Sequence, residues 1–400
     1  MLHGCSFFRL KKELSVMKSA ISLEGTITCN ESNNKPIIIA LYTMQSNEIK
    51  VYDYQVYLEP GQFKFMAEPD NYYLAAFLDL NNDLLFQSNE PAGFYGEPTL
   101  LITQPGQSLK NLNIEIIAPN PQAFKLYESS EISLGNFIRN PGTIIQINDE
   151  QFTEDIGKLG KWEPLDFLKK GYGGLFFLEP YDPKRIPILF VHGAGGYPQQ
   201  WGSILESLDN SKFQAWIFHY PSGFKMELVS EWLYSQIKIL RARYDLDKFY
   251  IIAHSMGGLV SLKYIQKQSQ SGHPPNIDLF VSISTPWTGS KTARLGTINP
   301  LAVVPSWKDI VPGSQFLEGL LLNPIPKGTQ YFLLFSYHGI PNPILVNNDG
   351  RVSISSQLDL RMQKKAVKIF GFNEKHSGIL SSKDLIKILS EIFDYSVGRS

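Results

Sequence analysis

One stretch, residues 251–258 with the sequence Ile-Ile-Ala-His-Ser-Met-Gly-Gly, constrains the fold more than any other part of the chain. An apolar, β-favouring run leads into Ser255, and an amphipathic helical pattern over residues 259–268 follows the two glycines. This order predicts a strand, a sharp turn and a helix, with the serine hydroxyl projecting from the turn. The small residues Ala253 and Gly257, two positions before and after the serine, allow strand and helix to approach closely.

Backbone amides near such a serine can stabilise a developing oxyanion. The first amide of the following helix, that of Met256, points into the same space as the hydroxyl. A glycine-rich turn at 193–196 follows the apolar strand predicted at 186–191, and we expect Ala194 to supply a second amide. This turn lacks the Gly-x-Gly-x-x-Gly spacing and the lysine of nucleotide-binding loops. We therefore predict an oxyanion hole formed by Ala194 and Met256, and a structural role for His192.

A serine nucleophile needs a histidine base to accept its proton. Three histidines follow Ser255 along the chain: His273, His338 and His376. His376 lies between the last predicted strand and the last predicted helix, in a loop at the same sheet edge as the serine. His273 precedes a strand and so lies at the wrong edge, and His338 comes before the acid candidate Asp349, out of the usual order. We predict that His376 is the base.

The histidine in turn needs a carboxylate that fixes its tautomer and stabilises the imidazolium. Asp349 lies in an Asn-Asn-Asp-Gly loop after the strand predicted at 331–335, between the serine and the histidine as the usual order requires. An ordinary β-turn would use the same residue types. Asp309 and Asp359 are the rival acids. We predict the triad Ser255, Asp349 and His376.

The pattern of the chain divides it into segments. Residues 1–19 are basic and are expected to be loosely ordered. Short β-rich runs separated by turns over 20–118 predict a small all-β sandwich. A mixed connector follows over 119–172. Alternating strands and helices over 173–395 predict a mostly parallel sheet with helices on both faces, and the apolar segment 286–329 is expected to cap the active site.

Four motifs, at 192–193, 253–258, 349–350 and His376, together resemble the α/β-hydrolase superfamily. They are most similar to the lipase-like groups that include GPI inositol-deacylases and triacylglycerol lipases, as are the runs at 220–223 and 284–290. The resemblance implies ester hydrolysis through an acyl-enzyme, without a metal or an organic cofactor. The alanine two residues before the serine departs from the usual glycine.

The β-rich segment resembles transthyretin-like and carboxypeptidase-regulatory-like modules, in Pro-Gly-Gln-Phe at 60–63 and in residues 70–77. Within this segment, Asp79, Asn81, Asp83 and Glu90 stand at positions one, three, five and twelve of a possible calcium loop. The sixth position of that loop needs a glycine, and the chain has a leucine there. A solvated turn is the competing interpretation.

Composition excludes some classes of partner. The chain has 400 residues and a net charge of -1, which gives no electrostatic case for nucleic acid. The sequence contains no run of 18 apolar residues, so no transmembrane helix is predicted. Peripheral membrane association remains compatible with a lipid ester substrate, and no feature predicts the oligomeric state.

The location of the protein depends on Cys5. The sequence Leu-His-Gly-Cys at 2–5 resembles the end of a lipoprotein signal, but no apolar segment precedes it. A true start further upstream would make Cys5 a lipidated residue in the cell envelope. Otherwise the match arises by chance and the protein is cytoplasmic.

Three functions compete on these residues. The first is a serine esterase or lipase that acts on a small-molecule or lipid ester. The second is an acyltransferase or amidase that uses the same triad. The third is a surface binding or adhesion protein in which the β-sandwich binds and the hydrolase fold is a scaffold.

Overall fold

The computed structural model describes most of the chain, in two compact units. The α/β unit comprises Met1–Leu10, Pro141–Gln236 and Leu246–Ser400, and the β unit comprises Lys11–Asn140 and Ile237–Asp245. The described residues are 2–30, 35–45, 48–84, 86–87, 89–96, 99–117, 141–244, 246–272, 276–298, 302–322, 325–340 and 347–398. His273, residues 119–140 of the predicted connector and the side chain of Cys5 lie outside them.

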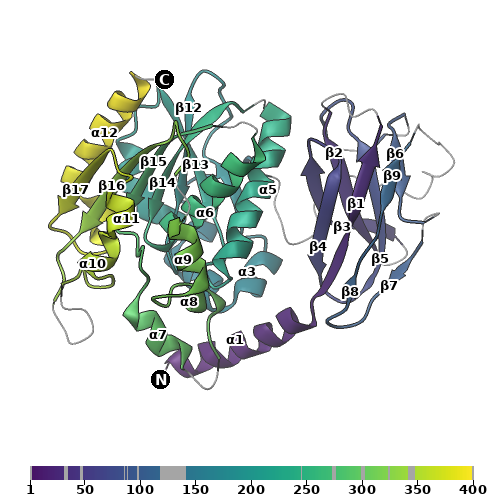
Figure 1. Cartoon of the computed structure of the whole chain (residues 1–400), viewed down its shortest axis with the longest axis horizontal. Helices are drawn as coiled ribbons and strands as arrows, with labels where there is room; N and C mark the ends of the chain where they lie inside the picture. The colour runs from purple at the N-terminus through teal and green to yellow at the C-terminus, as the bar shows by residue number, and fades with distance from the viewer. Residues whose placement is uncertain are drawn as a thin grey trace. The chain divides into compact units, whose positions relative to one another are not determined.

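The α/β unit is built on one eight-stranded sheet in the order β10-β11-β13-β12-β14-β15-β16-β17 (Figure 1). Neighbouring strands are parallel except for the antiparallel pair β11 and β13. The strands are β10 (Thr143–Ile144), β11 (Gly174–Phe177), β12 (Ile186–Val191), β13 (Phe213–His219), β14 (Lys248–His254), β15 (Asn276–Ile283), β16 (Gln330–Ser336) and β17 (Lys368–Phe372).

Helices cover both faces of this sheet because successive strand residues point to opposite sides. On β14, Tyr250 and Ile252 pack into a core that also contains the apolar face of α12. The intervening Phe249 contacts Tyr264 of α6 on the other face, with ring centroids 6.2 Å apart. The helices are α2 (Glu154–Trp162), α3 (Pro164–Lys169), α4 (Gly202–Glu206), α5 (Met226–Tyr244), α6 (Met256–Ser271), α7 (Lys291–Thr297), α8 (Pro305–Asp309), α9 (Gln315–Leu322), α10 (Ile354–Gln357), α11 (Leu360–Gln363) and α12 (Lys383–Val397).

The carboxyl edge of the sheet gathers the loops that carry the candidate site. Parallel strands end at the same edge, so the loops after β12, β14, β16 and β17 meet there. These are the loops that contain the glycine-rich turn, Ser255, Asp349 and His376, in that order. The predicted fold class, a mostly parallel sheet with helices on both faces preceded by an all-β part, is confirmed.

Two predicted segments differ in the structure. Residues 141–172 do not connect two domains, because β10 pairs in parallel with β11 and α2 and α3 belong to the α/β unit. The local pattern of residues 143–147 is compatible with a strand, but it does not show that this strand pairs with β11. Residues 2–19 form helix α1 (Leu2–Ser19) rather than a loosely ordered segment. Its leucine, lysine, glutamate and methionine residues favour a helix, and it contains no proline.

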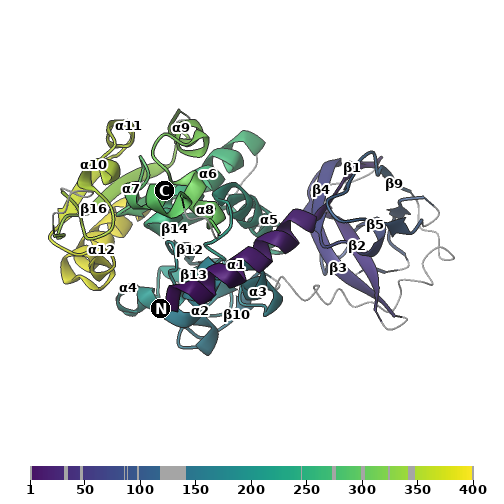
Figure 2. The same cartoon turned by 90° about the horizontal axis from the view of Figure 1, so that it is seen from below.

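The β unit contains two sheets that enclose one apolar core (Figure 2). In the first, β1 pairs with β4, β8 and β9, and in the second the order is β3-β2-β5-β6, with β7 pairing with β5. Residues such as Leu23 and Phe65 of the first sheet pack with Ile39 and Leu74 of the second. The strands are β1 (Ile21–Cys29), β2 (Ile37–Gln45), β3 (Glu48–Tyr57), β4 (Gly61–Ala67), β5 (Asn71–Leu78), β6 (Ala92–Phe94), β7 (Leu101–Ile102), β8 (Ser108–Leu109) and β9 (Ile114–Ile116).

The proposed calcium loop uses its carboxylates in another way. The buried Asp79 accepts hydrogen bonds from the three backbone amides of residues 82–84, at 2.7, 3.2 and 2.9 Å. Glu90, also buried, accepts two more amides, and Asn81 donates to Asp83 at 2.8 Å. In the part of the chain that the structure describes, no three His, Cys, Asp or Glu residues gather where they could hold a metal ion. None of the described helices is long and apolar enough to cross a membrane.

Candidate active site

Ser255 stands on the turn between β14 and α6, in a backbone conformation that residues other than glycine rarely adopt. Its φ of 55° and ψ of -127° lie outside the regions that non-glycine residues favour. Hydrogen bonds on both sides hold it there: its amide donates to the carbonyl of Ile283 at 2.8 Å, and its carbonyl accepts from Gly258 at 3.0 Å. The strained turn presents the hydroxyl at the carboxyl edge of the sheet.

Two glycines permit other segments of the backbone to approach Ser255 closely. A Cβ on Gly257 would lie 2.4 Å from the carbonyl oxygens of both Val191 and His192. A Cβ on Gly193 would lie 2.7 Å from the Cβ of Ser255. Both distances are far shorter than atoms tolerate, so helix α6 and the glycine-rich turn reach the serine only because these positions lack side chains.

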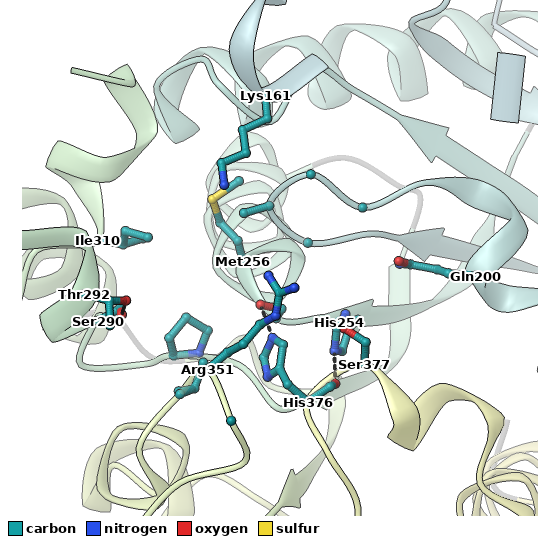
Figure 3. Close-up of a pocket in the computed structure, with 18 of the residues that line it drawn as sticks. Lys161, Gln200, His254, Met256, Ser290, Thr292, Ile310, Arg351, His376 and Ser377 are labelled. Carbon is teal, nitrogen blue, oxygen red and sulfur yellow. Dashed lines mark hydrogen bonds between the residues drawn. The ribbon is translucent and has the colours of Figure 1, made fainter. Parts of the chain in front are cut away.

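The structure brings Ser255, His376 and Asp349 together. Figure 3 shows His376 at the cavity, with His254 and Ser377 beside it. Nε2 of His376 lies 2.8 Å from Oγ of Ser255, and its Nδ1 lies 2.7 Å from Oδ2 of Asp349. An ionised carboxylate only accepts hydrogen bonds, so Nδ1 carries the proton and Nε2 is free to accept one from the serine. The amide of His376 also donates to the carbonyl of Asp349, at 2.8 Å.

Asp349 is fully buried and surrounded by donors. Its Oδ1 accepts the amides of Arg351 and Val352 at 3.0 and 2.8 Å. Its Oδ2 accepts the hydroxyl of Ser336 at 2.7 Å and Nε2 of Gln357 at 3.1 Å, besides His376. Burial alone would raise the pKa of Asp349, but the hydrogen bonds and the charge of His376 bring that pKa below its ordinary value. The carboxylate therefore stays ionised beside the imidazole.

His254, the residue before Ser255, fixes the backbone of His376. Its Nε2 lies 2.8 Å from the carbonyl oxygen of His376, so Nε2 is the donor. Burial, and then the neighbouring His376, lower the pKa of His254 to about 3, which keeps the ring neutral. The sequence reasoning did not identify this residue, nor Ser336 and Gln357 behind Asp349.

The glycine-rich turn is held in place from the loop after β13. The amide of Gly195 donates to Oγ of Ser222 at 2.8 Å, and that of Gly196 donates to the carbonyl of Gly193 at 3.0 Å. No hydrogen bond within the described part of the chain occupies the amide of Ala194 or of Met256. Both of these residues line the cavity in front of Ser255, where the oxyanion hole was predicted.

The rival residues have other partners. Asp309 accepts the backbone amide of Met226 at 2.8 Å, at the start of α5. Asp359 caps the start of α11. Exposed His338 pairs through Nδ1 with an asparagine, at 3.1 Å. His192 is buried, with Nδ1 2.9 Å from a backbone carbonyl and its ring stacked on a tyrosine, as the structural interpretation predicts.

A cavity of about 750 Å³ opens in front of Ser255 and His376. Its walls come from the glycine-rich turn, from α2, from the loop after Asp349, and from the segment 286–329. That segment forms α7, α8 and α9 in its described part. It contributes the wall residues Pro286, Ser290, Thr292, Ala293, Trp307 and Ile310.

A family model described as "Alpha/beta hydrolase of unknown function" matches residues 224–299, which include β14, Ser255 and α6. The larger unit has the α/β-hydrolase fold. No curated protein matches the sequence significantly.

Solved structures resemble the α/β-hydrolase unit at low sequence identity. The mature lipase BlEst2 of Bacillus licheniformis is 17% identical, with a TM-score of 0.44, and the match covers 55% of this chain and 97% of that one. The lin2722 product of Listeria innocua is 16% identical, with a TM-score of 0.42, and the match covers 52% and 94% of the two chains.

Proposed function

We propose that this protein is a serine hydrolase that cleaves a carboxylic ester through an acyl-enzyme. One observation carries the proposal. Oγ of Ser255, the ring of His376 and the carboxylate of Asp349 form a continuous hydrogen-bonded line, with contacts of 2.8 and 2.7 Å, at the wall of an open cavity. A scaffold for binding alone would need none of these three side chains in that arrangement.

The geometry supports a two-step reaction. Oγ of Ser255 attacks the carbonyl carbon of the ester while its proton passes to Nε2 of His376. The amides of Ala194 and Met256 stabilise the oxyanion of the tetrahedral intermediate. The C–O bond to the alcohol then breaks, and the alcohol takes the proton from Nε2. A water molecule repeats the sequence on the acyl-enzyme and releases the carboxylic acid and the free serine.

Hydrolysis of 4-nitrophenyl butanoate tests the proposal. We expect wild-type protein to turn over this ester and Ser255→Ala to lose at least about 10³-fold in kcat, because the nucleophile is absent. Ser261→Ala is a matched control: Ser261 lies on α6, the helix that follows Ser255, and its buried hydroxyl has no hydrogen-bond partner among the described residues. Full activity of Ser255→Ala, or no activity of wild type on any ester, would contradict the proposal.

The same assay separates hydrolysis from acyl transfer. Added glycerol competes with water for the acyl-enzyme, and the product mixture shows which acceptor the protein prefers. A hydrolase releases mainly free butanoic acid, whereas an acyltransferase on the same residues releases mainly the glycerol ester.

A further inference from the structure

Two basic side chains from distant parts of the sequence line the catalytic cavity. Lys161 comes from the end of α2, and Arg351 follows Asp349 in the loop after β16. In Figure 3, both side chains point into the space in front of Met256 and His376. The catalytic residues themselves do not require either cation, because the imidazole already has its carboxylate partner.

Lys161 is held beside the glycine-rich turn. A Cβ on Gly195 would lie 3.4 Å from Cδ of Lys161, so the lysine stem runs along this turn. Its ammonium faces the rings of Trp162 and Trp307, 5.2 and 5.5 Å from their centroids. The two indoles contact each other edge to face. The cation is thus positioned by aromatic rings rather than by an acid, and its stem lies along Gly195, the residue after the predicted oxyanion donor Ala194.

Arg351 supplies the second charge. Its backbone amide binds the carboxylate of Asp349, whereas its side chain is exposed at the cavity. Burial, and then the charge of Arg351, lower the pKa of Lys161, so the two cations are close enough to repel each other. Within the described residues, no ion pair involves either side chain.

The other ionisable groups of the cavity do not cancel these charges. Glu154 is the acidic side chain among the wall residues, and it is paired with Lys158 at 3.0 Å. Asp349 lies behind His376, where it is fully buried and hydrogen-bonded on both oxygens. His254 is neutral. The described wall of the cavity therefore carries an excess of positive charge next to the reacting serine.

Resting on the proposed function, we propose that the cavity selects esters that carry a negatively charged group, a carboxylate, phosphate or sulfate, within reach of Lys161 and Arg351. An anion placed between two like charges is attracted by both and removes their repulsion. Arginine and lysine are also the side chains that proteins use for such oxyanions. The anionic group can belong to the acid part or to the alcohol part of the ester.

Pairs of esters that differ in charge test this inference. For the acid part, the pair is 4-nitrophenyl hydrogen adipate and neutral 4-nitrophenyl heptanoate. For the alcohol part, it is 3-butanoyloxybenzoate and neutral phenyl butanoate. In at least one pair, we expect kcat/KM to be higher for the anionic ester by about tenfold or more at low salt. The pair that shows the preference tells which part of the substrate carries the charge.

Substitutions identify the residues responsible. Lys161→Met with Arg351→Gln should lower the anionic-to-neutral ratio of kcat/KM by about tenfold, because both charges are removed. Lys170→Gln is the matched control, since Lys170 is an exposed lysine that does not line the cavity, and its ratio should equal that of wild type. Ratios compare two substrates on one protein, so a partly unfolded preparation does not distort them.

Wild-type protein gives an independent test that needs no variant. Salt screens exposed charges, so the anionic preference should shrink between 10 mM and 500 mM NaCl while the rate on neutral ester changes little. Equal kcat/KM for charged and neutral esters in both pairs, or a ratio unaffected by the double substitution, would overturn the inference. The proposed function would survive that result, because it is tested by ester hydrolysis itself and by Ser255→Ala, not by the preference between charged and neutral esters.

Discussion

Asp349 in the α/β unit and Glu90 in the β unit are both buried carboxylates, and their environments shift their pKa values in opposite directions. Asp349 has five donors, including an imidazole, and its pKa lies below the ordinary value. Glu90 has two amide donors and carboxylate neighbours, and burial raises its pKa to about 7. Burial by itself favours the neutral acid, so a charged carboxylate needs a partner that can carry positive charge.

This difference separates a carboxylate that can act in catalysis from one that closes a turn. Asp349 stays ionised next to an imidazole that must become positive during the proposed reaction. Glu90 accepts the backbone amides of Leu80 and Gln87 on one carboxylate, and no base is among its hydrogen-bond partners in the described part of the chain. Three changes test the comparison.

Removing the charge from each carboxylate should have very different consequences. Asp349→Asn should lower kcat by about 10⁴-fold, because an amide neither stabilises the imidazolium nor fixes the tautomer. Glu90→Gln changes the matching atoms in the β unit and should leave kcat at the wild-type value. Steady-state kinetics on 4-nitrophenyl butanoate measures both. A comparable loss in the two variants would show that Asp349 acts only through folding.

The two units should respond to pH in opposite directions. Burial lowers the pKa of His192 to about 4 and of His254 to about 3, from an ordinary 6.5. Below pH 6.5 the unfolded chain therefore binds protons that the folded unit does not, and stability falls as pH falls toward 4. The slope is about 1.4 kcal/mol per pH unit for each imidazole. For Glu90, with its raised pKa, the favourable contribution is present below about pH 4.5 and is lost as pH rises through 7.

Tryptophan fluorescence isolates the response of the α/β unit, because all six tryptophans of the chain belong to it. Urea unfolding at pH 7, 6 and 5 should show the falling stability. Amide hydrogen exchange in β5 reports the β unit, and its protection should rise over the same interval. Glu90→Gln should flatten that rise, and parallel trends in both units would contradict the comparison.

Removing one donor should make Asp349 more like Glu90. Ser336→Ala deletes the 2.7 Å hydrogen bond to Oδ2 and should lower kcat by about tenfold, the value of one charge-assisted hydrogen bond. Ser336→Thr keeps the hydroxyl and should recover most of this loss. Equal activity of Ser336→Ala and wild type would indicate that the remaining donors are sufficient.

The sequence predicted the parts of the site that depend on local pattern. The strand, turn and helix around Ser255 follow from an apolar run and two glycines, and the loop order along a parallel sheet brings His376 to the same edge. The choice between Asp349 and the rival acids could not be settled this way, because aspartate also caps helices. Asp309 and Asp359 do so here.

Other features depend on contacts between distant segments. Ser336 ends a strand and Gln357 ends a short helix, and nothing near them in the sequence marks either as a partner of Asp349. The cations Lys161 and Arg351 meet only because α2 and the loop after β16 face the same cavity. The parallel pairing of β10 with β11 likewise joins two segments whose contact no local pattern indicates.

Covalent labelling tests the central claim, that Ser255 is a nucleophile activated by His376 and Asp349. Folded protein is treated with a fluorophosphonate, and the modified peptide is identified by mass spectrometry. We predict one adduct per chain, on Ser255, formed more slowly in Asp349→Asn and absent in Ser255→Ala. An adduct on another residue, or an unlabelled Ser255 in folded protein, would contradict the account.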